Sequence, residues 1–162
     1  MLETQRKQGF APVFDKDSRV LILGSFPSVK SREIDFYYGH KQNRFWKMLC
    51  GYFGEEIPSL VEGKKDFLQR RKIALWDMVV SCEIEGSADA TVKNPVTADL
   101  NTVLNHAPIE KILLNGTLSY QLFIDSYAQL NVPHEKMPST SPANPRYKEE
   151  TWHRALDEVF KS

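Results

Sequence analysis

The sequence predicts an α/β protein, specifically a three-layer α/β/α sandwich with a mostly parallel four-stranded sheet. Short apolar runs, each the length of one strand, alternate along the chain with longer segments in which apolar residues recur at helical spacing. The first run also has the length and branched content of a strand that is buried on both faces. Regular alternation of this kind is typical of parallel strands covered by helices on both sides.

Four segments are expected to form the sheet. The first spans residues 19–28, where Val20, Leu21, Ile22 and Leu23 form an apolar run that Gly24 and the following proline end abruptly. The other three expected strands are residues 73–76, residues 112–114 and the shorter segment His134–Met137.

Five segments are expected to be helical. Thr97 before Asp99 resembles a capped helix start, and the Gly116-Thr117 pair likewise turns a strand into a helix. The expected helices are residues 43–53, 64–71, 97–106, 118–130 and 148–160.

The chain of 162 residues is the right length for one domain, so residues 1–162 are predicted to form a single unit, with flexibility expected only in residues 1–9. Hydrophobic residues make up 41% and charged residues 26%, as in an ordinary soluble protein. No apolar stretch approaches the roughly 18 residues that cross a bilayer. The charged N-terminal residues 1–6 do not resemble a secretory signal, so we expect a cytoplasmic protein that does not enter a membrane.

The cysteines and the charges argue against several classes of site. Cys50 and Cys82 lie far apart without clustered histidines, so we expect two buried thiols, no disulfide, no metal and no other cofactor. Lys plus Arg and Asp plus Glu each number 21, which argues against extensive phosphate binding. A local cluster of cations either faces a pocket or is a solvated surface. This cluster contains Lys30, Arg32, His40, Lys41, Arg44 and Lys47.

Polar residues follow every predicted strand. In a parallel sheet these carboxyl ends lie at one edge, so the polar residues are expected to border a common cleft. Turn chemistry alone would also explain each ending. The loop of residues 37–46 adds aromatic rings, amides and cations, which suit a flat base beside phosphates. The endings are Gly24–Ser28, Asp77, Asn115-Gly116 and residues 139–144.

Three segments resemble the motifs of the hypoxanthine-DNA glycosylases, also called DNA-deoxyinosine glycosylases, within the uracil-DNA glycosylase superfamily. They are GSFPS at residues 24–28, YYGHKQNRFW at residues 37–46 and PSTSPAN at residues 138–144. The resemblance extends over about residues 10–160. It implies a uracil-DNA glycosylase-like sandwich, a DNA partner, and excision of deaminated bases in base excision repair by a monomer without a metal.

The resemblance assigns catalysis to Asn43. Many relatives carry Asp or Asn at the third position of the first motif, where this chain has Phe26, a side chain that cannot orient water. Lys41 stands where the second motif would carry a proline, which leaves the conformation of that loop open. Cleavage places positive charge on the sugar and negative charge on the purine, so a neutral amide suffices to position water. Without the resemblance, Asn43 would be interpreted as a helix cap.

The resemblance and the residue chemistry together define the candidate site. A flipped base needs a flat partner. Phe26 is the first candidate, followed by Tyr37 and Tyr38, whereas Phe45 and Trp46 are expected in the core. The predicted base pocket contains Gly24, Ser25, Phe26, Pro27, Tyr38, Gly39, His40, Gln42, Asp77 and Asn115. Predicted DNA contacts are Ser28, Lys30, Lys41, Arg44, Ser139, Thr140, Ser141, Pro142, Ala143, Asn144 and Arg146.

Alternatives remain for several of these assignments. Asp77 and Asn115 are expected either to contact the purine edge or to have a structural role. Lys30 and Lys41 are the lysines near the motifs, and a Schiff-base mechanism would need one of them, but phosphate contacts or solvated charges explain both, so a monofunctional enzyme is favoured. A uracil-preferring or mismatch glycosylase, or a catalytically silent damaged-DNA binding module, would fit the same residues.

Overall fold

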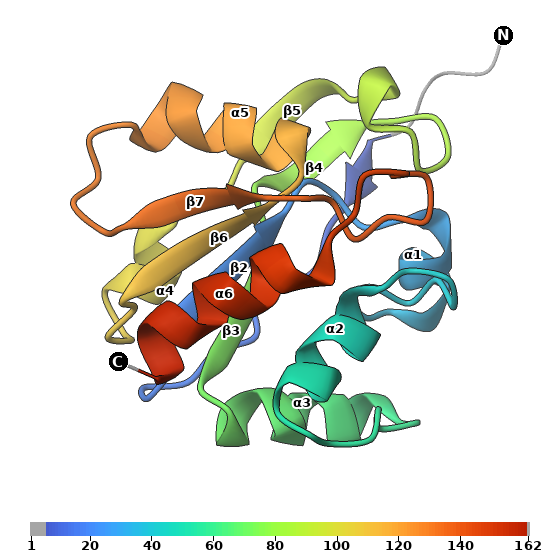
Figure 1. The fold of residues 1–162 in the computed structure, drawn as a ribbon. Coiled ribbons are helices and arrows are strands. Elements are labelled where there is room, and N and C mark those ends of the chain that lie inside the picture. The colour runs from blue at the N-terminus through green and yellow to red at the C-terminus, as the bar shows by residue number, and fades with distance from the viewer. Residues whose placement is uncertain (1–5, 162) are drawn as a thin grey trace, which may run out of the picture.

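A computed structural model describes residues 6–161 and contains the predicted parallel sheet (Figure 1). Its strand order is β3–β2–β6–β7, and all neighbouring strands are parallel. Val20 pairs with Ile73 on one side and with Lys111 on the other. The predicted strands and the α/β/α fold are therefore confirmed. The strands are β2 (Val20–Gly24), β3 (Ile73–Asp77), β6 (Lys111–Asn115) and β7 (His134–Met137).

Helices cover both faces of this sheet (Figure 1). On one face, α2 (Phe45–Tyr52) packs on α6 (Glu149–Phe160), and α3 (Val61–Arg70) lies beside α2. A hydrogen bond of 2.7 Å from the Tyr52 hydroxyl to Asp157 joins α2 to α6. On the other face, the Tyr127 hydroxyl connects α5 (Thr117–Tyr127) with the segment before α4 (Asn101–Leu104) by donating to the Ala98 carbonyl.

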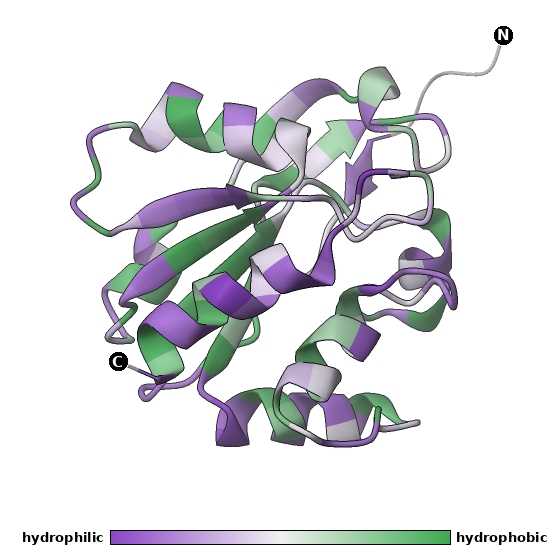
Figure 2. Ribbon diagram, in the orientation of Figure 1, coloured by the Kyte–Doolittle hydropathy of each residue, from purple (hydrophilic) through white to green (hydrophobic). Residues whose placement is uncertain are grey.

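The core lies between these layers. Residues 20–23 of β2 have no exposed surface, because helices cover the sheet on both sides. Figure 2 shows the central strands as mostly hydrophobic, whereas hydrophobic and hydrophilic residues alternate along the helices. Phe45, Trp152 and Phe123 contribute large buried rings from the two helical layers. Each such ring removes a large apolar area from water, which is the main driving force for the packing.

A second sheet was not predicted. It is antiparallel, with the order β1–β4–β5. The single residue Met78 separates β4 (Val79–Glu83) from β3, and β5 (Lys93–Thr97) is exposed over most of its length. Residues 1–5 of the segment expected to be flexible lie outside the described residues, while Lys7–Gln8 form β1 and pair with Cys82 and Ser81.

One helical expectation was wrong, and one short helix was not predicted. Residues 97–106 do not form one helix, because Thr97 ends β5 and α4 begins only at Asn101. Residues 29–34 form an unpredicted short helix, α1 (Val29–Ile34), which Ser28 caps. By contrast, Gly116 precedes α5 as expected, with a φ of +98° that favours glycine. Within residues 6–161, no helix is long and apolar enough to cross a membrane.

Candidate active site

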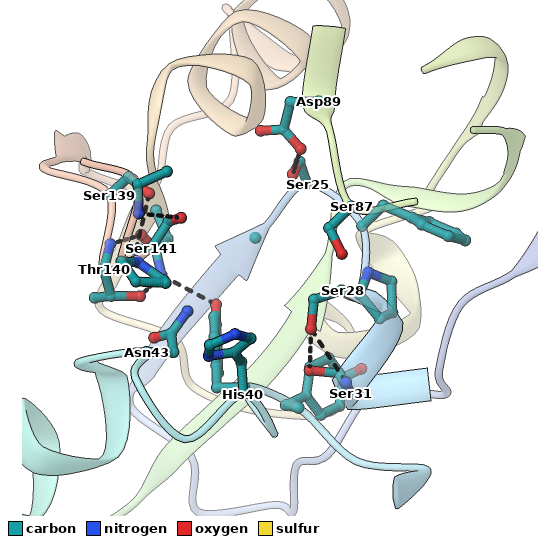
Figure 3. A pocket seen from close by; sticks show the side chains of 18 of the residues that line it. Ser25, Ser28, Ser31, His40, Asn43, Ser87, Asp89, Ser139, Thr140 and Ser141 are labelled. Atoms are coloured by element: carbon teal, nitrogen blue, oxygen red, sulfur yellow. Dashed lines mark hydrogen bonds between the residues drawn. The ribbon is translucent and has the colours of Figure 1, made fainter. Parts of the chain in front are cut away.

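A pocket of about 670 Å³ lies at the carboxyl ends of the parallel strands. Its lining comes from the segments after β2, β3, β6 and β7, from the loop before α2 and from the β4–β5 connection (Figure 3). The structure thus brings the four strand ends together, as their parallel arrangement requires. The predicted site residues in the lining are Gly24, Ser25, Phe26, Pro27, Ser28, Tyr38, His40, Asn43, Asp77, Asn115, Ser139, Thr140, Ser141, Pro142, Ala143 and Asn144.

Asp77 is a buried carboxyl group in this lining. Its side chain is only 5% exposed, and its Oδ2 atom has no hydrogen-bond partner among the described residues. Burial, together with the negative charge of Asp89, raises the pKa of Asp77 to about 7, although a hydrogen bond from the Gly24 backbone acts in the opposite direction. An unpaired buried carboxyl is costly, so its presence in a pocket indicates a functional group.

Because Gly24 has no side chain, the Asp77 carboxyl can pack directly against its backbone. The two residues are paired across β2 and β3, and a Cβ atom added at Gly24 would lie 2.5 Å from Asp77 Oδ1 and 3.1 Å from the Tyr38 hydroxyl. Contacts this short force the neighbouring side chains to move. The glycine is therefore required by close packing under the pocket.

We expect the substitution Gly24→Ala to displace Asp77, to lower stability by about 2 kcal/mol and to reduce strongly the base release that the sequence resemblance implies. Gly51→Ala is the matched control, because the nearest atom to its added Cβ is 3.8 Å away and alanine favours the helix there. Urea denaturation and a base-release assay on both variants check this expectation. Wild-type activity in Gly24→Ala would show that the close contact is unimportant.

Asn115 connects three segments at the side of the pocket. Its Nδ2 donates to the Tyr38 hydroxyl at 3.2 Å and to Thr140 Oγ1 at 3.0 Å, and its Oδ1 accepts from the Thr140 backbone N–H at 3.0 Å. The Tyr38 ring stacks on Phe45 at 3.9 Å between centroids. Burial raises the pKa of the Tyr38 hydroxyl, which stays neutral. Since both amide hydrogens of Asn115 are used internally, its geometry favours positioning over contact with a base.

The Asn43 side chain bonds the first backbone N–H of α2, one residue before the N-cap Arg44, and also borders the pocket. Its Oδ1 accepts a hydrogen bond of 2.9 Å from the Phe45 backbone N–H, in the first turn of α2. This bond fixes the amide orientation, because an NH₂ group there would face another donor. Figure 3 shows Asn43 and His40 toward one end of the pocket and Asp89 with Ser25 toward the other. The cap leaves Nδ2 and one Oδ1 lone pair of Asn43 for a water or a ligand.

Arg44 stabilises the 139–144 loop from within the protein. Its guanidinium donates to the Thr140, Ser141 and Asn144 carbonyls, and it lies 4.3 Å from the centroid of the Tyr147 ring. Arg44 is one of the predicted DNA contacts, and in the structure its Nε and Nη2 groups donate to backbone carbonyls. Arg44 thereby links the loop that carries Asn43 to the loop after β7.

Replacing Arg44 by lysine should loosen residues 139–144, because an ammonium group cannot reproduce the planar donor fork. We expect a stability loss of about 2 kcal/mol and weaker binding of duplex DNA, the partner that the sequence resemblance implies. Lys47→Ala, an exposed position on the same helix, is the control and should match the parent. Denaturation midpoints and fluorescence anisotropy with a labelled duplex measure both effects. Unchanged affinity in Arg44→Lys would contradict a positioning role.

The aromatic residues divide between the pocket and the core. Phe26 lines the pocket but is only 9% exposed and packs in a small cluster with Val79, Cys82 and Ile84. Tyr37 also lines the pocket but is buried, and its hydroxyl donates to the Ala11 carbonyl at 2.8 Å. The core positions predicted for Phe45 and Trp46 and the buried state predicted for Cys50 and Cys82 are confirmed.

Six predicted site residues lie outside the lining. Gly39 donates its N–H to Ser31 Oγ at 2.8 Å, and Lys30 pairs with Glu33 at 3.3 Å. Of the predicted cation cluster, only His40 lines the pocket. The six are Gly39, Gln42, Lys30, Lys41, Arg44 and Arg146.

Four of the residues that line the pocket were not predicted from the sequence to belong to the site. Three of them, including Asp89, belong to the β4–β5 connection, whose position depends on the unpredicted second sheet. Arg32 and Ser25 hold this connection by hydrogen bonds to the Gly86 carbonyl and to Asp89. No local sequence signal marks these residues as part of a site. The four are Ser31, Ser87, Ala88 and Asp89.

Fold and pocket define the class: an α/β/α sandwich whose site lies at the carboxyl ends of a parallel sheet. Within that class, residues 11–158 match the family model described as the Uracil DNA glycosylase superfamily. The chain belongs to this superfamily and, by its similarity to the relatives that follow, to its hypoxanthine DNA glycosylases. The predicted resemblance is thus confirmed.

Two curated relatives are described as Hypoxanthine DNA glycosylase. The protein from Methanosarcina barkeri is 36% identical over 116 residues, which cover 70% of this chain and 73% of the relative. The protein from Methanosarcina acetivorans is 30% identical over 143 residues, covering 87% of this chain and 90% of the relative. A solution NMR structure of a candidate uracil DNA glycosylase from Methanosarcina acetivorans is 28% identical with a TM-score of 0.83, covering 95% of this chain and 98% of that one.

Proposed function

We propose that this protein is a monofunctional DNA glycosylase that hydrolyses the N-glycosidic bond of deaminated bases, chiefly hypoxanthine, in base excision repair. The observation that carries the proposal is the Asn43 amide, held by the Phe45 N–H at the edge of a pocket large enough for a nucleoside. The curated relatives described as Hypoxanthine DNA glycosylase support the choice of base.

In the proposed mechanism, the deoxynucleotide rotates out of the duplex and its base enters the pocket. Phe26 offers a flat surface next to the base. Asn43 positions water for attack on C1′ while positive charge develops on the sugar and negative charge on the base. Hydrogen-bond donors in the pocket, including His40 and backbone amides, stabilise the developing negative charge.

We assign DNA contacts to the rim of the pocket. Residues 139–144 supply hydroxyl and amide groups, which bind phosphate without adding net charge. Ser28 lies at the start of α1, and the exposed cations Lys30, Lys41 and Arg146 can reach phosphates farther along the strand. Within the described part of the chain, the pocket lining contains no lysine, which favours a monofunctional enzyme over one that forms a Schiff base.

The proposal extends to the whole chain. Residues 1–162 would act as one glycosylase domain and as a monomer in the cytoplasm. In residues 6–161, no group of three or more His, Cys, Asp or Glu side chains is placed to hold a metal ion. The mechanism proposed above uses only side chains, backbone amides and water.

The test uses labelled duplexes that contain deoxyinosine or deoxyuridine. The protein is incubated with each duplex, and abasic sites are then cleaved with alkali. Release of hypoxanthine without strand cleavage before alkali is the expected result. Faster release of uracil would identify a uracil-preferring glycosylase, and duplex binding without release of either base would identify a catalytically silent binding module.

A further inference from the structure

The pocket contains a second carboxyl group, Asp89, which faces the site from the β4–β5 connection. Its Oδ1 accepts a hydrogen bond of 2.9 Å from Ser25 Oγ, in the segment after β2 (Figure 3). The Asp89 charge acts on Asp77 and raises the pKa of Asp77. Two acidic side chains thus border a pocket in which a base must depart with its bonding electrons.

Among the described residues that line the pocket with Asp77, none is a lysine or an arginine. Tyr37 and Tyr38 approach from the loop before α2, and both have a raised pKa, so they remain neutral. From β6, Asn115 contributes an uncharged amide. Asp89 faces Asp77 from the β4–β5 connection, and His40 is the remaining titratable side chain in the described lining. Asp77 lines the pocket, and its Oδ2 is buried without a hydrogen-bond partner among the described residues, so the carboxyl keeps an unused hydrogen-bonding atom at the pocket wall.

We propose that the protonated carboxyl of Asp77 acts as a general acid toward the departing purine and that Asp89 is a positioning residue that keeps Asp77 protonated. This inference rests on the proposed glycosylase function. An ionised Asp77 would repel the negative charge that develops on the base, whereas the acid form donates to it.

In the proposed step, the bond between C1′ and N9 breaks, and its electron pair goes to the purine. Asp77 Oδ2 gives its proton to a ring nitrogen of the purine other than N9. Water adds to C1′ and releases a proton to solvent, and the Asp77 carboxylate regains a proton from solvent. The products are neutral hypoxanthine and an abasic deoxyribose.

The first test is the pH dependence of single-turnover release of hypoxanthine from a deoxyinosine duplex, measured from about pH 5.5 to 8.5. For the parent, the rate should fall about tenfold per pH unit above roughly pH 7, since only the acid form is active. Asp77→Asn should be slower by about a hundredfold at pH 6 and should lack this fall. Circular dichroism establishes that the variant is folded.

Asp89→Asn tests the positioning role of Asp89, which is more exposed than Asp77. Removing its negative charge should lower the pKa of Asp77, so the midpoint of the rate decrease should move to lower pH. The control Glu85→Gln removes a charge from an exposed position of the same connection outside the pocket lining, and its midpoint should match that of the parent. A ¹³C NMR titration of the Asp77 carboxyl in the free proteins reports the same shift without turnover.

The outcomes separate this inference from the proposed function. If the parent releases hypoxanthine but Asp77→Asn has the parent's rate and pH profile, or if Asp89→Asn leaves the Asp77 titration unmoved, the general-acid proposal is overturned and the glycosylase assignment stands. If the parent releases no hypoxanthine at any pH, both fall.

Discussion

The substitution Asn43→Ala should lower the rate of hypoxanthine release by about a hundredfold to a thousandfold. The amide borders the pocket and can hold a water, and removing a single preorganised polar group from an active site has an effect of this size. The variant loses the group that positions water but retains the pocket and the DNA-binding rim. Its affinity for a deoxyinosine duplex should therefore stay close to that of the parent in a fluorescence anisotropy titration.

Asn43→Ser separates catalysis from helix capping. Alanine also removes the oxygen that accepts from the Phe45 N–H, which should cost about 1 kcal/mol of stability. Serine restores an oxygen for this hydrogen bond but has no amide, so it should recover stability without recovering activity. A serine variant as active as the parent would show that Asn43 serves only as a cap.

Most of the central sheet could be predicted from the sequence because β2, β3 and β6 are buried on both faces. The run at residues 20–23 is uniformly apolar, so its length and composition suffice to identify it. The second sheet lacks such a signal. β4 follows β3 after one residue, and β5 is mostly exposed and contains Pro95, which by itself argues against a strand. These two strands pair through backbone contacts that no sequence periodicity marks.

The candidate site could be predicted where its residues follow directly from the topology. Asp77 and Asn115 end parallel strands, so their arrival at one edge is a consequence of strand order. Asp89 could not be found in this way, since its position depends on the β4–β5 connection. Arg44 shows a different limit: its partners are backbone carbonyls 96 to 100 residues away, and a sequence does not reveal which cations meet such acceptors.

Asp77→Asn should stabilise the protein above pH 7 while it impairs activity. The folded-state pKa of about 7 exceeds the ordinary value of 3.8, so between these values the native protein binds more protons than the unfolded chain. The free energy of unfolding then decreases as pH rises from about 4 to about 7, and the full penalty is present above pH 7. A pKa shift of this size lowers the free energy of unfolding by at most about 4 kcal/mol, and we expect a loss of about 2 kcal/mol.

Urea denaturation of the parent and of Asp77→Asn at pH 5 and at pH 8 measures this penalty. The unfolding free energy of the variant minus that of the parent should be about 2 kcal/mol larger at pH 8 than at pH 5. The other titrating groups contribute equally to both proteins, so they cancel in this comparison. A difference independent of pH would contradict a buried, titrating Asp77. A gain at pH 8 together with slower base release is the pattern expected when a carboxyl is retained for chemistry despite its cost to folding.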